Sequence, residues 1–298
     1  MQITELPANL APSANPERGG INLSFGSTRN PQALIASPQW RLAGWTLQFA
    51  LLPASEALEA APSSARVYAK VITGTLEQPK RRPYATPFEV RSTRLQGEVR
   101  AGASGALVAI FTEAANAPTE LGDMSEVVFQ GPMAEELPFV HFHERFNAVT
   151  DFFRDADAYM TSGIHLLDEH GEEIANVIFW TAGKGVGLST HNHGHDPSAT
   201  APAFAEVHWV MANGTGSGGM YLCDAQDAEP RQRFPMQRGD EHGPFFHIDG
   251  TTQRPRLKDN GAVDYPWHGW EAGTNDEQGQ AYDLVCAFEI TAPYASLA

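Results

Sequence analysis

This chain contains little cysteine, and its first residues do not resemble a secretion signal. The 298 residues include two cysteines, Cys223 and Cys286, and neither belongs to a Cys-x-x-Cys pair. Two cysteines cannot build a disulfide framework, so we expect reduced, buried thiols of the kind found in cytosolic proteins. Residues 1–20 lack the basic and apolar segments of a secretory signal, which agrees with a cytoplasmic location.

Long apolar segments and positive charge are also missing. No stretch approaches the roughly 18 consecutive apolar residues that a membrane helix requires. Lys and Arg number 20 against 36 Asp and Glu, so the net charge is −16 at pH 7. Nucleic-acid binding requires clustered Lys and Arg, which this balance opposes. We therefore expect neither a membrane nor a nucleic acid as a partner.

Helical periodicity is limited to two segments. Residues 144–160 repeat apolar side chains at three- and four-residue steps, and a shorter candidate covers 55–61. Elsewhere, short runs of β-branched and aromatic residues are separated by Gly, Pro, Asn and Asp, as in antiparallel sandwiches and barrels. The clearest predicted strands cover residues 66–76, a hairpin at 161–180, and residues 205–212, 219–223 and 282–290.

The longer predicted helix falls at mid-chain, with strand-rich sequence on both sides. This arrangement predicts an all-β protein of two tandem domains, residues 1–145 and 146–298, joined by a short helix. One large sandwich with an N-terminal extension is the alternative. Because β-sandwich proteins often pair through strand edges, a homodimer is a reasonable expectation.

The most informative segment contains a closely spaced histidine pair. His191 and His193 are two residues apart, and side chains at i and i+2 of a strand project from the same face. Both imidazoles can then converge on one ion. Glu206 follows after a loop and leads the apolar run VHWVMA. Two imidazoles and a carboxylate with open positions suit Zn, Fe, Mn or Ni.

Several other histidines compete for a fourth ligand position. His242 and His247 lie beside a turn in the sequence GDEHGPFFH. His208 would share the face of the carboxylate if that strand is regular. His195 continues the alternation of the histidine pair, but the Asp-Pro that follows it favours a solvated loop.

The histidine pattern resembles a known superfamily. The arrangement G-x5-H-x-H at 185–193, followed by Glu206, is similar to the first motif of the cupins, and G-x2-H at 239–242 is similar to the core of the second. The resemblance implies double-stranded β-helix (jelly-roll) domains, of which we expect the N-terminal one to be metal-free. It also implies a divalent metal, zinc by preference, held in the C-terminal domain by His191, His193, Glu206 and His242.

Two segments resemble a narrower family within the cupins. The stretches AFAEVHWVMANGTGSGGM at 203–220 and YPWHGWEAG at 265–273 look like the cupin part of the aldos-2-ulose dehydratases. That family pairs tandem cupin domains with a propeller, and it dehydrates and isomerises ketosugars such as anhydrofructose and glucosone. The resemblance therefore implies a metal-dependent lyase or isomerase acting on a ketosugar.

Such a reaction needs groups that move protons beside the metal. The ion would act as a Lewis acid on the carbonyl and stabilise the enediolate that forms when a neighbouring C–H proton leaves. Glu206 would be a ligand and a candidate base. His208 and His268 are the candidates for proton transfer, because imidazoles exchange protons near neutral pH.

Substrate contacts are predicted around the last of these histidines. Trp267 and Trp270 flank His268 and offer flat apolar faces to sugar C–H groups. Tyr265 and Lys184 can donate hydrogen bonds to a developing oxyanion. Two other functions stay open on the same residues: an Fe(II)-dependent dioxygenase, and a non-catalytic sugar-binding cupin with a structural metal.

Overall fold

The protein is described here by a computed structural model. It describes residues 6–42, 44–60, 66–77, 88–113, 158–182, 190–192, 204–212, 218–226, 228–243, 246–252, 254–271, 283–291 and 293–294. These residues form eighteen strands and no helix, which confirms the all-β expectation for the described part of the chain. Within the same ranges, no helix has the length and apolar character needed to cross a membrane.

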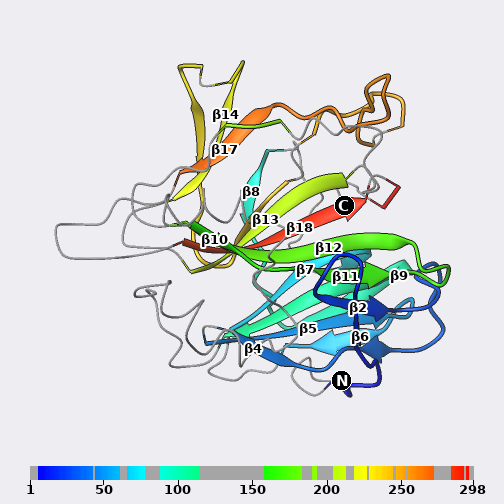
Figure 1. The fold of residues 1–298 in the computed structure, drawn as a ribbon. Helices are drawn as coiled ribbons and strands as arrows, with labels where there is room; N and C mark the ends of the chain where they lie inside the picture. Colours follow the sequence, from blue (N-terminus) through cyan, green and yellow to red (C-terminus); the bar gives the residue numbers. More distant parts are fainter. Residues whose placement is uncertain are drawn as a thin grey trace.

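The strands form three sheets that lie one above another (Figure 1). The middle sheet has nine strands, in the order β1 (Ser13–Ala14), β2 (Ile21–Ser24), β11 (Ile164–Leu167), β12 (Glu173–Ala182), β18 (Asp283–Thr291), β13 (Phe204–Ala212), β16 (Asp240–His242) and β8 (Val90–Ser92), with β10 (Ala158–Met160) paired to β12.

The two outer sheets are smaller. Below the middle sheet lie β3 (Ile35–Ala36), β5 (Trp45–Leu52), β9 (Glu98–Glu113) and β6 (Ala57–Glu59), with β4 (Trp40–Leu42) paired to β5 and β7 (Arg66–Glu77) paired to β9. Above it lie β15 (Gln232–Pro235), β14 (Gly219–Cys223) and β17 (Trp267–Glu271).

The strands predicted from β-branched and aromatic runs are confirmed as β7, the β11–β12 hairpin, β13, β14 and β18. The shorter helix prediction, 55–61, is wrong. Ser55 adopts a left-handed backbone conformation with φ 62°, which stops a helix, and Ala57–Glu59 pair with β9 as a strand. Both cysteines are free and buried, as expected.

The predicted linking helix covers 144–160, and residues 144–157 lie outside the described residues. Its last three residues form strand β10 instead, pairing with Ala182, Thr181 and Trp180. The predicted domain boundary at 145 also lies outside the described residues. On the N-terminal side of that boundary, β2 pairs with β11 and β8 pairs with β16, so strands from both halves of the chain complete the middle sheet.

The lower face of the middle sheet packs against the six-stranded sheet through large aromatic side chains. Trp209 of β13 is fully buried and stacks on Phe111, with ring centroids 3.8 Å apart. Trp45 and Tyr68 meet the same indole edge-on, and the indole Nε1 donates to Thr93 Oγ1 at 2.8 Å. Burial of this cluster fixes the strands that carry the functional side chains on the opposite face.

One charged residue lies on this apolar side. Glu241 of β16 pairs in register with Trp209 and is fully buried. Lys70 Nζ lies 3.2 Å from one carboxylate oxygen, and Arg91 Nη2 lies 3.3 Å from the other. Because β7 and β8 supply these two cations, the N-terminal strands hold β16 in place beside the site.

Gly239, which begins the second cupin-like motif, has a packing reason to be glycine. Its φ is +83°, a conformation that other residues rarely adopt. A Cβ atom at this position would lie 2.3 Å from the ring of Tyr68. The turn before β16 can therefore approach the aromatic cluster only if residue 239 has no side chain.

Candidate metal centre

Two histidines far apart in sequence meet on paired backbone segments. His191 and His268 form an isolated antiparallel bridge in which each backbone N–H donates to the other's carbonyl at 2.9 Å. Directly opposite residues of an antiparallel pair project from the same face. The two imidazoles are accordingly neighbours, with ring centroids 4.5 Å apart.

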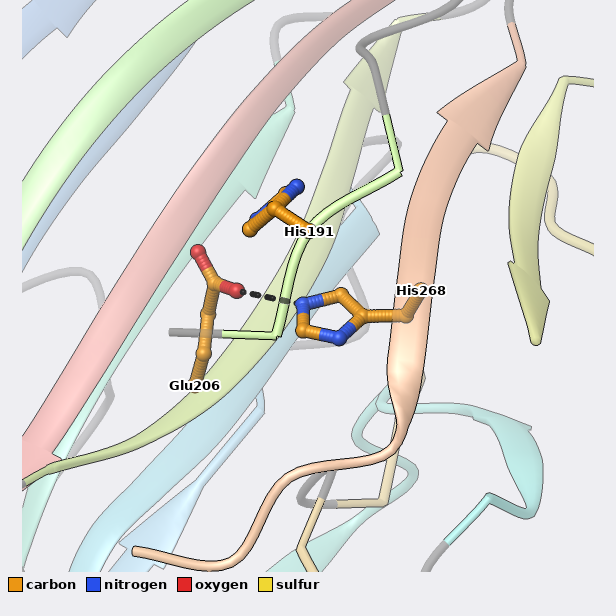
Figure 2. A group of neighbouring side chains, drawn as sticks. All are labelled: His191, Glu206 and His268. Carbon is orange, nitrogen blue, oxygen red and sulfur yellow. Dashed lines mark ion pairs between the residues drawn. The ribbon is translucent and has the colours of Figure 1, made fainter. Parts of the chain in front are cut away.

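Glu206 reaches the same point from the middle sheet (Figure 2). Its Oε2 lies 3.5 Å from His268 Nε2, and one ligand atom from each of His191, Glu206 and His268 lies within 4.8 Å of the others. Glu206 is 7% exposed and His268 is fully buried. Two imidazoles and a carboxylate therefore converge between the middle and upper sheets.

Backbone contacts orient one of these imidazoles. His268 Nδ1 lies 2.9 Å from the carbonyl oxygen of Pro266, and a carbonyl can only accept, so this ring nitrogen donates. In the neutral tautomer, Nε2 then carries the lone pair and faces the Glu206 carboxylate. Metal-ligating histidines are commonly oriented in this way, with the second ring nitrogen donating to a carbonyl.

These residues fit a divalent cation. A buried carboxylate beside two imidazoles directs several electron pairs into one small volume. A cation bound there stabilises this arrangement, and without a cation the burial of the carboxylate is energetically costly. Three protein ligands with open positions are typical of catalytic zinc sites, and the same ligand types also suit iron or manganese. The expectation that His191 and Glu206 come together is thus met by the geometry, with His268 as the third member.

A second histidine pair lies next to this group. His208 Nε2 is 3.1 Å from Glu206 Oε1, and His208 Nδ1 is 2.9 Å from His242 Nε2. The backbone N–H of His208 also donates to His242 Nε2 at 2.8 Å, and His242 Nδ1 donates to the Gly243 carbonyl at 2.6 Å. Each ring nitrogen of His208 thus contacts a polar group, Nε2 the Glu206 carboxylate and Nδ1 the imidazole of His242.

His242 is held as a neutral imidazole. Its side chain is fully buried, with 0% exposed to solvent. Burial lowers the pKa of His242 well below its usual value, and the neighbouring His208 adds to this effect. In this arrangement both ring nitrogens of His242 contact protein groups. Among the described residues, the convergent group of three does not include His242. Its role as a metal ligand stays a prediction.

The remaining predicted site residues are placed as follows. His193 and Lys184 lie outside the described residues, so their roles stay predictions. Trp270 is two residues from His268 on β17 and shares its face. Its indole packs in a T-shaped arrangement with Trp180, with ring centroids 5.2 Å apart. Trp267 lies on the other face of that strand and is partly exposed.

Tyr265 lies beside the convergent group but uses its hydroxyl proton elsewhere. Its ring centroid is 5.7 Å from that of His268, and its hydroxyl donates to the carbonyl of Phe204. Burial raises the pKa of Tyr265 well above its usual value, and the negative charges of Glu206 and Glu289 add to this rise. The hydroxyl therefore stays protonated and directed at the backbone.

Comparison with known proteins assigns the chain to a family. Residues 12–291 match the family model described as the aldos-2-ulose dehydratase/isomerase (AUDH) cupin domain. The chain belongs to this cupin family. A curated relative, aldos-2-ulose dehydratase of Phanerodontia chrysosporium, is 36% identical over 151 residues, which are 46% of this chain and 16% of the relative. The match thus spans about one sixth of that relative's length.

The solved structures that align with this chain are more distant in sequence. A cupin 2 conserved barrel domain protein from Leptotrichia buccalis aligns over 87% of this chain and 90% of its own, at 12% identity and a TM-score of 0.28. Vicilin from Corylus avellana aligns over 95% of this chain and 84% of its own, at 10% identity and a TM-score of 0.27.

Proposed function

We propose that this AUDH-family cupin is a metal-dependent lyase or isomerase that acts on a ketosugar such as anhydrofructose or an osone. The observation that carries the proposal is the convergence of His191, Glu206 and His268 within 4.8 Å. The family match over residues 12–291 supplies the reaction class. The same match supports a small-molecule sugar as partner, while a homodimer and a cytoplasmic location remain predictions.

Three side chains of this centre would hold a divalent ion, with zinc preferred. When bound, the ion would supply Lewis-acid polarisation of a substrate carbonyl, which stabilises negative charge next to it. Because His268 is engaged as a ligand in this proposal, it no longer serves as a proton carrier. His208 takes that role.

His208 is suited to moving a proton. Its Nε2 lies 3.1 Å from Glu206 Oε1, and its Nδ1 rests against the neutral ring of His242. In the proposed reaction, Glu206, the candidate base, takes up on Oε1 the proton from the carbon beside the carbonyl, and an enediolate remains. A proton from His208 Nε2 then departs with the β-hydroxyl as water, or returns to the neighbouring carbon for isomerisation.

The aromatic side chains would limit the access of water to these steps. Trp180 lies edge-on to His208, with ring centroids 5.3 Å apart, and Trp270 contacts the same pair of rings. Trp270 Nε1 donates to Asp283 Oδ2 at 2.9 Å, which fixes the indole. A fixed apolar face beside the imidazole suits the C–H face of a sugar ring.

Enone absorbance provides the test. Purified protein is loaded with zinc, its metal content is measured, and anhydrofructose is added with and without a chelator. We expect enone formation that the chelator abolishes and zinc restores. Absence of turnover on anhydrofructose and glucosone at full metal occupancy would contradict the proposal. Oxygen consumption that iron restores and zinc does not would indicate the dioxygenase alternative instead.

A further inference from the structure

The backbone segment that carries His191 lies along one edge of β17. His191 pairs with His268 of β17 through two backbone hydrogen bonds, and β14 pairs with the other edge of the same strand. Figure 2 shows His191 and His268 extending from these two neighbouring segments toward Glu206. β17 therefore lies between β14 and the segment of His191.

Three residues line up across these segments on the face that is turned away from the metal centre. Tyr221 of β14 pairs in register with Gly269 of β17. The antiparallel bridge between the two histidines places Thr190 opposite Gly269 on the other edge. Successive residues of a strand alternate in direction, and directly opposite residues share a face. Thr190, Gly269 and Tyr221 thus follow the face opposite to that of the two imidazoles.

A hydrogen bond joins the two ends of this line. Thr190 Oγ1 lies 3.0 Å from the hydroxyl oxygen of Tyr221. Neighbouring strands are about 4.8 Å apart, so the bond connects residues that are separated by two such spacings. A tyrosine side chain is long enough to bridge that span, and Gly269 between the two residues has no side chain to obstruct the ring. Tyr221 therefore crosses β17 and fastens the segment of His191 to β14.

This hydrogen bond is shielded from water. Tyr221 is 2% exposed and Thr190 is 3% exposed. The guanidinium carbon of Arg231 lies over the Tyr221 ring, 4.6 Å from its centroid. Because water does not readily replace a buried partner, removal of one hydroxyl leaves the other without this hydrogen bond at a cost in free energy. The contact consequently restrains Thr190 more firmly than an exposed hydrogen bond would.

The restraint acts on the backbone next to a proposed metal ligand. Thr190 directly precedes His191, so a fixed position of Thr190 limits where the imidazole can lie. Groups that orient metal ligands from outside the ligand set contribute to metal affinity, because the ligands are then already ordered when the ion arrives. The bridge to His268 restrains the same segment through its backbone.

We infer that Tyr221 is a positioning residue of the metal centre, and that it acts on His191 through its hydrogen bond to Thr190. The inference rests on the metal ion of the proposed function and is independent of the identity of the substrate. Because the Tyr221 side chain follows the face of β17 opposite to that of His268, its hydroxyl contacts neither the ion nor the substrate.

Zinc affinity tests this role without turnover. A competitive titration with a chromophoric chelator measures the zinc Kd of the full-length protein. We expect Tyr221→Phe, which keeps the ring and removes the hydroxyl, to raise the Kd about 10-fold. Thr190→Val removes the partner hydroxyl at nearly constant shape and should have the same effect. Thr190→Ser retains a hydroxyl at this position and should stay near the wild-type Kd.

A second tyrosine provides the matched control. The hydroxyl of Tyr294 donates to Asp168 Oδ2 at 2.8 Å, in the turn between β11 and β12. Tyr294→Phe therefore loses the same kind of hydrogen bond away from β17 and should leave the zinc Kd unchanged. Urea denaturation of the metal-free proteins shows whether each variant is folded before zinc is added. A Kd that rises equally in Tyr294→Phe would overturn the inference, because the effect would then be a general loss of stability.

The double variant shows whether the two hydroxyls act as one unit. Tyr221→Phe combined with Thr190→Val should raise the zinc Kd no further than either single change, because each removes the same hydrogen bond. Effects that multiply in the double variant would overturn the inference. Unchanged Kd values in both single variants would also overturn it.

Turnover separates this inference from the proposed function. At saturating zinc, Tyr221→Phe should keep the kcat and KM for anhydrofructose near their wild-type values, while the zinc concentration for half-maximal enone formation rises with the Kd. A raised KM at full zinc occupancy would overturn the inference and make Tyr221 a substrate contact. Zinc affinity that depends on Tyr221 and Thr190 without turnover of a ketosugar would refute the function and retain the positioning role. A wild-type protein that binds no zinc would overturn both.

Discussion

The two faces of the middle sheet are built from alternate residues of the same strands, yet they are stabilised in opposite ways. On β13, Val207 and Trp209 face the six-stranded sheet and are fully buried among apolar side chains. Glu206, which precedes Val207, and His208, which lies between Val207 and Trp209, face the upper sheet. Both contact other charged or polar groups. One strand therefore contributes to both the core and the candidate metal centre.

The difference shows where the stability of this protein originates. Burial of large apolar side chains on the lower face contributes favourable free energy. Two neighbouring carboxylates and several buried imidazoles on the upper face are unfavourable without a cation or fixed protons. Functional sites commonly depart from the rules that stabilise a fold, and the surrounding packing compensates for the departure.

Truncating the lower face should produce the largest loss of stability. Trp209→Ala removes an indole that stacks on Phe111 and contacts Trp45, so we expect the free energy of unfolding to fall by about 3–5 kcal/mol. Urea denaturation followed by circular dichroism measures the change. Trp209→Phe, which preserves an aromatic ring, should lose clearly less. A loss below about 1 kcal/mol in the alanine variant would show that this face is not the main source of stability.

Truncating the upper face should instead remove the metal. Loss of a residue outside the ligand shell typically weakens metal binding about 10–100-fold. We expect Glu206→Ala, which removes a ligand, to weaken zinc binding by a larger factor. Elemental analysis after dialysis and a competitive zinc titration measure this. The urea midpoint of the metal-free variant should change much less than that of Trp209→Ala. Wild-type zinc content in Glu206→Ala would show that the convergent group is not a metal site.

The pH dependence of stability should also differ between the faces. The pKa of His242 is lowered in the folded protein, so the unfolded chain binds its proton first as the pH falls. The stabilisation is complete above the unfolded value of about 6.5 and is lost as the pH falls toward the folded value.

We therefore expect the metal-free protein to lose up to about 1.4 kcal/mol per pH unit below pH 6.5 from this residue. His242→Gln, whose amide oxygen can still accept from the backbone N–H of His208, should remove that part of the slope. Unfolding free energies at pH 7.5, 6.5 and 5.5 provide the comparison. An identical slope in both proteins would show that His242 takes up its proton in the folded state.

Exposed ion pairs on the upper sheet should contribute least. Arg233 of β15 and Glu271 of β17 lie 3.0 Å apart across the small sheet, and their side chains are 63% and 38% exposed. Solvent screening limits such a pair, so Arg233→Ala should change the free energy of unfolding by no more than about 1 kcal/mol. The same urea titration at low and high salt measures it. A larger loss would mean that the upper sheet depends on its edge contacts.

Local sequence patterns were sufficient for part of this site. Glu206 leads a run whose alternation the structure retains, and His191 lies near that carboxylate, while the predicted convergence of His191 with His193 stays a prediction. Asn176 and Glu289, which form a hydrogen bond across β12 and β18, are single polar residues within apolar strands, and a local pattern does not identify them as partners. Their adjacency depends on the register between β12 and β18.

Other features could not be predicted from local patterns. His268 was expected to transfer protons, yet backbone pairing with His191 brings it into the convergent group. The entry of β2 and β8 into the sheet of the C-terminal strands likewise depends on pairing between distant segments. The prediction was wrong for the last three residues of the mid-chain helix, because these residues pair with β12. Tertiary pairing here outweighs a weak helical preference.

The sequence by itself determined the all-β class, the family and the alternation that separates an apolar from a polar face on β13. These properties follow from side-chain chemistry repeated along a single strand. Only the tertiary structure decided which histidines meet Glu206. Strand register is fixed when three sheets pack together, because a slip of one residue would turn every buried side chain to the opposite face.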